Sequence, residues 1–152
     1  MPGTLLPTNI DNTYRGYRLG LWLLGVVLFV KVAQIVSVFV DGPGIVADAD
    51  GVPLATFSPA ASRTVVAAFM GMGISRLLLC VVFALVLWRY RSATPLTFGL
   101  LALHDVAREL VLRPVRMGTP IGVYVNAGLF VLTLAGIALA LSHPTQARKR
   151  EQ

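Results

Sequence analysis

Long apolar segments of this sequence contain five charged residues at a depth where charged side chains are rare. They are Lys31, Arg76, Asp105, Arg108 and Glu109. The polar residues Gln34, His104 and Asn126 lie in the same segments. Inside a membrane, side chains of these types bind a substrate or an ion, relay protons, or hold helices together as pairs. These eight residues are therefore the candidate site.

The charges are expected to pair with one another. A single charge at the centre of a membrane helix costs at least ~2.5–3.5 kcal/mol, so five that faced lipid separately would be prohibitive. The polar residues between positions 104 and 109 share one arc of about 140° on a helix, which lets them face the same way. We predict a buried network in which Lys31 and Arg76 meet Asp105 and Glu109.

Other kinds of site have weaker support in the sequence. His104 could bind a metal ion with Asp105 and Glu109, but no second histidine lies at metal-ligand spacing and Arg108 lies among them. Cys80 is the only cysteine, so neither a disulfide within the chain nor a CxxC redox centre can form. No catalytic or phosphate-binding motif is present. We therefore predict no metal ion, no cofactor and no catalytic residue.

Four apolar segments position these side chains. They cover residues 19–40, 59–88, 95–112 and 120–141, and each is long enough to cross a bilayer as a helix. Hydrophobic residues make up 56% of the 152 residues and charged residues 13%, a balance that a soluble domain of this size could not bury. The sequence predicts an all-α membrane protein, a single four-helix transmembrane domain that spans residues 1–152, with a basic tail at 143–152.

Local signals mark where the helices begin and how closely they pack. Each of the pairs 58–59, 94–95 and 119–120 places a hydroxyl residue before a proline, which is typical of a capped helix start. Small residues recur at four-residue spacing at Ala67, Gly71 and Ser75, and again at Gly136 and Ala140. Such stripes let membrane helices approach closely, so both are expected to pack within the bundle.

The polar residues of all four segments fall at a similar depth. At ~1.5 Å per residue from the cytoplasmic helix ends, Lys31 and Arg76 lie about 18 Å deep. Residues 105–109 lie about 16 to 21 Å deep and Asn126 about 22 Å by the same count. A shared depth favours one network over scattered charges.

The flanking charges predict the orientation. With a cytoplasmic N-terminus, seven basic residues lie on the cytoplasmic side: Arg15, Arg18, Arg89, Arg91, Arg148, Lys149 and Arg150. Three basic residues, Arg63, Arg113 and Arg116, lie on the other side. This bias predicts that both ends are cytoplasmic and that the protein lies in a bacterial inner membrane. The net charge of +6 gathers at helix ends, which argues against nucleic acid as a partner.

The segment 41–58 is the only sizeable loop and is expected outside the cytoplasm. Its Asp50-Gly51 turn between short extended pieces is compatible with a small β-hairpin. Asp48 and Asp50 do not form a calcium loop, because the twelve-residue ligand frame with its closing glutamate is missing.

The segment from Arg18 and Leu19 through an apolar helix to Lys31 resembles the first helix of small four-helix membrane proteins of the DoxX type. The resemblance covers this helix alone. It implies a four-helix architecture and carries no function.

Three classes of function remain open at this point. The first is an accessory subunit whose charged network holds the bundle or meets another membrane protein or a second copy of the chain. The second is a small proton- or cation-coupled transporter with a polar cavity in the middle of the membrane. The third is a membrane enzyme acting on lipid or quinone, with His104 and Asp105 as the acid–base pair. A polar cavity would favour the second class over the first.

Overall fold

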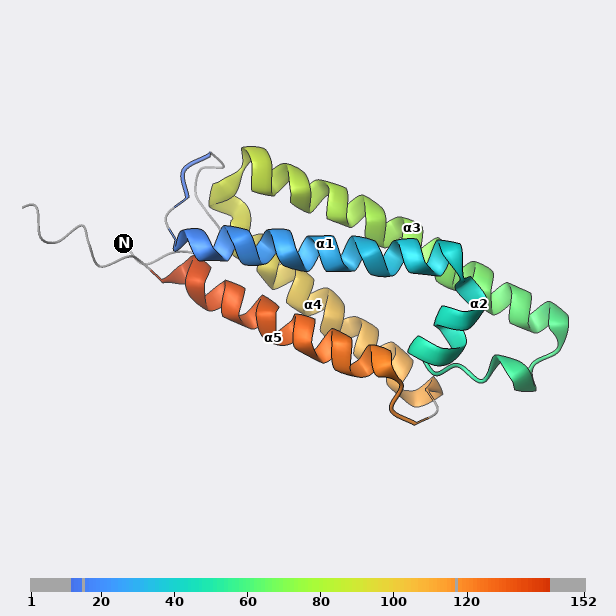
Figure 1. Cartoon of the computed structure of the whole chain (residues 1–152). Coiled ribbons are helices and arrows are strands. Elements are labelled where there is room, and N and C mark those ends of the chain that lie inside the picture. Colours follow the sequence, from blue (N-terminus) through green and yellow to red (C-terminus); the bar gives the residue numbers. More distant parts are fainter. Residues whose placement is uncertain (1–11, 15, 117, 143–152) are drawn as a thin grey trace, which may run out of the picture.

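Four long helices form the bundle in the computed structural model of this chain, which describes residues 12–14, 16–116 and 118–142. They are α1 (Arg18–Val40), α3 (Pro59–Arg89), α4 (Thr94–Leu112) and α5 (Ile121–Leu141) (Figure 1). Short helical turns connect them: α2 (Gly42–Gly44), η1 (Ile45–Ala49), η2 (Leu54–Thr56), η3 (Arg91–Ala93) and η4 (Arg113–Val115). The four long helices begin and end within one residue of the predicted segments. The predicted basic tail at 143–152 lies outside the described residues.

The predicted helix caps form at one of three places. Ser58 accepts a hydrogen bond from the backbone N–H of Ala61, so α3 begins as expected. The cap predicted at Thr94 is wrong, because the η3 turn leads directly into α4 and Thr94 is already a helical residue. At α5 the N-cap is Pro120, without a side-chain hydrogen bond.

The loop between α1 and α3 is not a β-hairpin. Asp41 accepts a hydrogen bond from the backbone N–H of Gly44, which keeps the chain helical after α1 and through η1. Val46 is fully buried, so the loop packs back onto the bundle. At Gly122, the first turn of α5 approaches the loop so closely that a Cβ atom would lie 2.3 Å from the carbonyl oxygen of Ala49. No strand occurs in the part of the chain that the structure describes.

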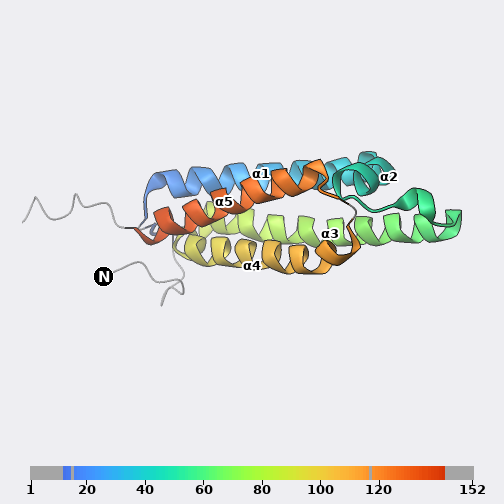
Figure 2. The same cartoon turned by 90° about the horizontal axis from the view of Figure 1, so that it is seen from below.

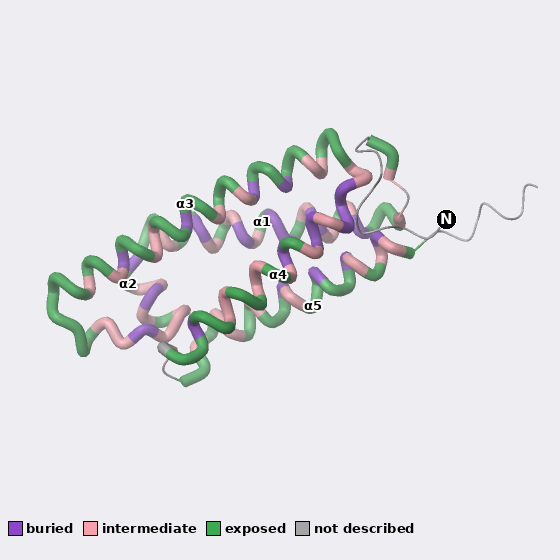
Figure 3. Tube along the Cα trace, turned by 180° about the vertical axis from the view of Figure 1, so that it is seen from behind, coloured by how far each residue is buried: buried purple, intermediate pink, exposed green. Residues whose placement is uncertain are grey.

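Helix α1 is the centre of the bundle. It packs along both α3 and α5, and α4 packs along α5, whereas α3 and α4 touch little and diverge toward the loop end (Figures 1 and 2). The buried positions turn toward the middle of the bundle (Figure 3). They include ten core residues: Leu24, Val27, Leu28, Ile35, Cys80, Phe83, Phe98, Leu101, Leu129 and Ala140.

The two stripes of small residues differ in their surroundings. Gly136 lies against the ring of Phe98 and Ala140 is buried, so this stripe packs within the bundle as predicted. Ala67, Gly71 and Ser75 are exposed, and no atom lies within 4 Å of a Cβ placed on Gly71. The prediction that the α3 stripe packs within the chain is therefore wrong, because α3 turns other residues toward α1.

Among the described residues, three helices, not four, are long and apolar enough to cross a membrane: α1, α3 and α5. Helix α4 has the length, but Asp105, Arg108 and Glu109 lie within it. Large hydrophobic side chains such as Trp22, Phe29 and Leu78 are exposed over the outside of the bundle. Because lipid is the solvent that accepts such a surface, the chain is a membrane protein.

Candidate functional site

Lys31 and Asp105 form the central ion pair of the bundle. The Nζ atom of Lys31 donates a hydrogen bond of 2.7 Å to Oδ1 of Asp105, and the two side chains are 3% and 11% exposed. His104 Nδ1 lies 3.3 Å from the same oxygen. The other carboxylate oxygen, Oδ2, is buried and has no hydrogen-bond partner among the described residues. This pairing of α1 with α4 is the part of the predicted network that forms.

Arg108 pairs with a residue that the network did not include. Its guanidinium forms a hydrogen-bonded ion pair with Asp50, which the docked loop brings into the bundle. From the sequence, Asp50 was assigned to the turn of a possible β-hairpin, so this partner was missed. The one available signal was a charge count, since the candidate site contains three cations but only two carboxylates.

Glu109 is not part of a buried network. Both of its carboxylate oxygens accept hydrogen bonds from Arg116, at 2.9 and 3.2 Å, and its side chain is 45% exposed. The prediction that Glu109 meets Lys31 or Arg76 is therefore wrong. Glu109 lies one turn before the end of α4, where the chain turns back and brings Arg116 within reach.

Gln34 and Asn126 add a polar contact between α1 and α5. Gln34 Nε2 donates a hydrogen bond of 3.3 Å to Oδ1 of Asn126. The amide nitrogen of Asn126 donates in turn to the carbonyl oxygen of Gly122, at 2.7 Å. This contact lies at the edge of the candidate site and fixes the side chain of Asn126.

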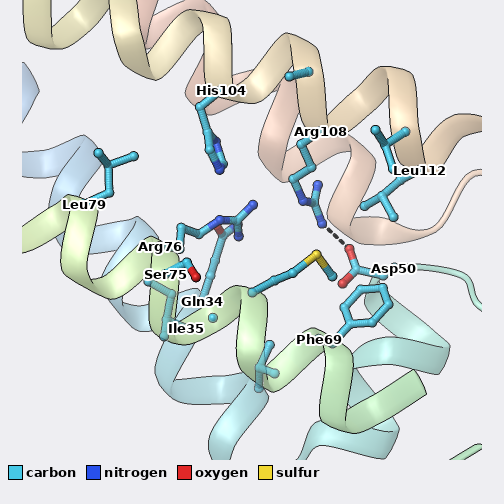
Figure 4. Close-up of a pocket in the computed structure, with 15 residues that line it drawn as sticks. Gln34, Ile35, Asp50, Phe69, Ser75, Arg76, Leu79, His104, Arg108 and Leu112 are labelled. Carbon is cyan, nitrogen blue, oxygen red and sulfur yellow. Dashed lines mark hydrogen bonds and ion pairs between the residues drawn. The ribbon is translucent and has the colours of Figure 1, made fainter. Parts of the chain in front are cut away.

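A cavity of about 510 Å³ lies between α3 and α4, with α1 at its base. Arg76, His104, Arg108 and Asp50 contribute the charged and titratable groups of its lining (Figure 4). Most other lining residues are apolar and come from all three helices. Met72 and Val111 line it and are themselves exposed, so the cavity reaches the outer surface between α3 and α4.

Arg76 is the unpaired cation of this cavity. Among the described residues it has neither a hydrogen bond nor an ion pair, and in Figure 4 its guanidinium points into the space below His104. Asp50 and Arg108 neutralise each other, so the lining carries one net positive charge at Arg76. The predicted pairing of Arg76 with a carboxylate of α4 does not form, because α3 and α4 diverge at this level.

A smaller cavity of about 190 Å³ adjoins the first toward α5. The two share Gln34, Val38, Asp50, Arg76 and Arg108 as lining residues, so the Arg108–Asp50 pair lies between them. Of the predicted site residues, Gln34, Arg76, His104 and Arg108 line the larger cavity, and Asn126 lines the smaller one. Lys31 and Asp105 lie beside these spaces and line neither.

No group of three or more histidine, cysteine, aspartate and glutamate side chains lies close enough to hold a metal ion within the described ranges. Comparisons of the chain with protein families, with curated proteins and with solved structures find no match. The candidate site is therefore interpreted from its own geometry.

Proposed function

We propose that all four long helices cross a bacterial inner membrane, with both chain ends in the cytoplasm. Helix α4 has 19 residues, about 28 Å at 1.5 Å per residue, and two of its three charges pair within the bundle. The start of α1 and the end of α5 lie together, where the Tyr17 N–H donates to the Leu139 carbonyl. The bias of basic residues toward this end supports its cytoplasmic placement.

Single cysteines in a Cys80→Ser background test this arrangement. A membrane-impermeant maleimide is expected to label Ala55→Cys and Thr119→Cys in intact spheroplasts. It should label Tyr90→Cys and Ser142→Cys only after permeabilisation. If Tyr90→Cys and Thr119→Cys react from the same side, α4 does not span the membrane and the arrangement is wrong.

We propose that the function of the chain is to bind, as a small membrane carrier, an amphipathic anion in the cavity between α3 and α4. The observation that supports this is the unpaired Arg76. It lies 13 residues before the end of α3, about 20 Å along the helix axis and near its middle. An unpaired charge at this depth costs at least ~2.5–3.5 kcal/mol, which a bound anion would offset.

The lining of the cavity supports one class of ligand. One net positive charge suits a monoanion, such as a carboxylate or a phosphate monoester, and does not suit the proton or cation that the sequence suggested. Apolar walls and an opening between two helices suit a hydrocarbon tail that enters from the lipid. A volume of about 510 Å³ is typical of cavities that bind small molecules.

Binding of radiolabelled laurate to the protein in nanodiscs of zwitterionic lipid tests the proposal. We expect saturable binding that weakens at least tenfold in Arg76→Gln and is absent for dodecanol, which has the same tail without the charge. Arg63→Gln is the matched control, since it removes the same charge from α3 far from the cavity. Equal affinity in Arg76→Gln and the unmodified protein would reject the proposal.

A partner-binding accessory role is the second candidate, and the exposed α3 stripe of Ala67, Gly71 and Ser75 favours it. Small residues on a lipid-facing helix allow a second helix to approach closely, and a second copy of this chain is the occupant we propose. Gly71→Leu should abolish a dimer that is detected by cross-linking in membranes, while Leu78→Ala should leave it intact. A monomeric unmodified protein would reject this candidate.

A further inference from the structure

A separate groove lies at the opposite end of the bundle from the loop, between α1 and the end of α3. Its volume is about 660 Å³, and we call it the Arg18–Arg91 groove after the two charged residues in its lining. Its other lining residues are apolar and include Trp22, Gly25 and Phe29. It shares no residue with the Arg76 cavity.

The two arginines are not neutralised within the described part of the chain. Arg18 has no hydrogen bond or ion pair there, and Arg91 donates only from Nε, to the carbonyl oxygen of Leu87 at 3.2 Å. That bond holds the Arg91 side chain against α3, and its two terminal nitrogens have no partner among the described residues. Guanidinium groups bind phosphate oxygens through paired N–H donors, so two of them match a phosphodiester.

The apolar part of the groove continues away from the arginines along α1. Phe29 is eleven residues beyond Arg18, which is about 16 Å along the helix. Gly25 keeps the groove open because it has no side chain. A Cβ atom at this position would already be in van der Waals contact with Cδ2 of Leu87, at 3.8 Å. Trp22 and Phe29 are each 74% exposed, so they offer a wide apolar surface to a neighbour. Charge at one end and apolar surface along the rest match the shape of a lipid that stands parallel to the helices.

We propose that the Arg18–Arg91 groove binds one phospholipid with an anionic head group. Its phosphate lies between the two guanidinium groups and one acyl chain follows Gly25 toward Phe29. The head group then lies at the membrane surface and the acyl chain inside the hydrocarbon, as in the surrounding leaflet. The inference requires only that α1 and α3 cross the bilayer, so it stands whether or not Arg76 binds an anion.

Native mass spectrometry of the protein in a mild detergent tests this site, with phosphatidylglycerol and phosphatidylcholine of identical chains as probes. We expect one phosphatidylglycerol to bind preferentially. Affinity should fall about 5-fold when one arginine becomes glutamine and about 30-fold when both do, from roughly 1 kcal/mol per basic residue. Arg63→Gln, which removes a charge at the other end of α3, should bind the lipid like the unmodified protein.

Two further arms separate lipid binding from the alternatives. Gly25→Leu fills the groove, keeps both arginines and should also lose the preferential lipid, so the result does not depend on the double variant folding. Millimolar inorganic phosphate should not displace the lipid, because it lacks the acyl chain. Undiminished binding in the double variant or in Gly25→Leu, or full displacement by phosphate, would overturn the proposal.

Discussion

Asp50 in the loop and Arg108 on α4 form an ion pair between segments that are 58 residues apart in the sequence. The pair ties the loop to α4 between the Arg76 cavity and the smaller cavity beside it. It also neutralises Arg108, so the charge of the cavity is determined by Arg76 alone. The loop thus helps to define the site and does more than connect α1 to α3.

Breaking this pair should loosen the loop. In Asp50→Asn we expect faster hydrogen exchange of the backbone amides of residues 45–57, because the charged contact that holds the loop on α4 is lost. Asp48→Asn is the matched control, since Asp48 lies in the same turn and has no ion pair among the described residues. Exchange that is equally fast in both variants would show that apolar packing of Val46 holds the loop by itself.

The Lys31–Asp105 pair should dominate the stability of the bundle. Asp105→Asn leaves the buried Lys31 ammonium without its counter-charge, and loss of one partner of a buried pair costs about 3–5 kcal/mol. Glu109→Gln removes a carboxylate from the same helix, but the Glu109 side chain is 45% exposed, against 11% for Asp105. We therefore expect the folded yield in detergent to collapse in Asp105→Asn and to fall less in Glu109→Gln, where water can replace part of the lost contact with Arg116.

A double variant shows whether the pair itself is needed. In Lys31→Met with Asp105→Leu no charge remains to be buried, so folded yield should recover toward that of the unmodified protein. Recovery would show that folding requires each of the two charges to be neutralised and does not require the pair itself. Failure to recover would mean that the bundle requires the hydrogen bonds of these two side chains, including the contact with His104.

The helices and the central pair could be predicted from the sequence because each depends on local information. The length of the apolar segments and the turns between them determine the four helices. Lys31 and Asp105 could be paired because they lie at a similar depth in the membrane and were expected to face the inside of the bundle. The predictions failed for contacts that depend on how the helices are placed relative to one another. Glu109 shares an arc with Asp105, but it lies a turn closer to the helix end, where Arg116 reaches it. Arg76 lacks a partner because α3 and α4 diverge, which no local pattern reveals.

The conformation of the loop between α1 and α3 was predicted wrongly for a related reason. An Asp-Gly pair between apolar residues is a hairpin signal, but a hairpin needs two strands that pair. Here Asp41 caps the turn that follows α1, and Val46 is buried against the bundle. The helical loop that results brings Asp50 to Arg108. A surplus of cations in the apolar segments indicated that a carboxylate was missing, without indicating which one.

Close packing of α4 on α5 depends on a glycine. A Cβ atom on Gly136 would lie 2.3 Å from Cε1 of Phe98, whose ring is fully buried. Gly136→Ala should therefore destabilise the protein by about 1–3 kcal/mol, as overpacking of a core does, although alanine is the better helix former. Thermal unfolding in detergent measures the change.

Gly128, also on α5, provides the matched control. No atom lies within 4 Å of a Cβ placed there, so Gly128→Ala should be neutral or stabilising by up to about 1 kcal/mol. If Gly136→Ala is as stable as Gly128→Ala, the Phe98 ring moves freely and the two helices are not held at this point.

Tyr14 should give the bundle a distinct weakness at high pH. Its hydroxyl is buried without a hydrogen-bond partner among the described residues and lies over Gly20, where a Cβ atom would be only 2.5 Å away. Burial disfavours the phenolate and raises the pKa of Tyr14 from 10 to about 12. Below pH 10 the side chain is neutral in both the folded and the unfolded chain, so its contribution to stability is constant there.

Between pH 10 and pH 12 the two states differ. The unfolded chain releases the Tyr14 proton while the folded chain retains it, so the free energy of unfolding falls as pH rises through this window. Tyr14→Phe removes the group that titrates, and its loss of stability from pH 10 to pH 12 should be smaller than that of the unmodified protein. Tyr17→Phe, which changes an exposed tyrosine three residues away, should behave like the unmodified protein. Chemical unfolding at several pH values measures the difference, and identical slopes for Tyr14→Phe and the unmodified protein would show that the Tyr14 hydroxyl is hydrated in the folded state.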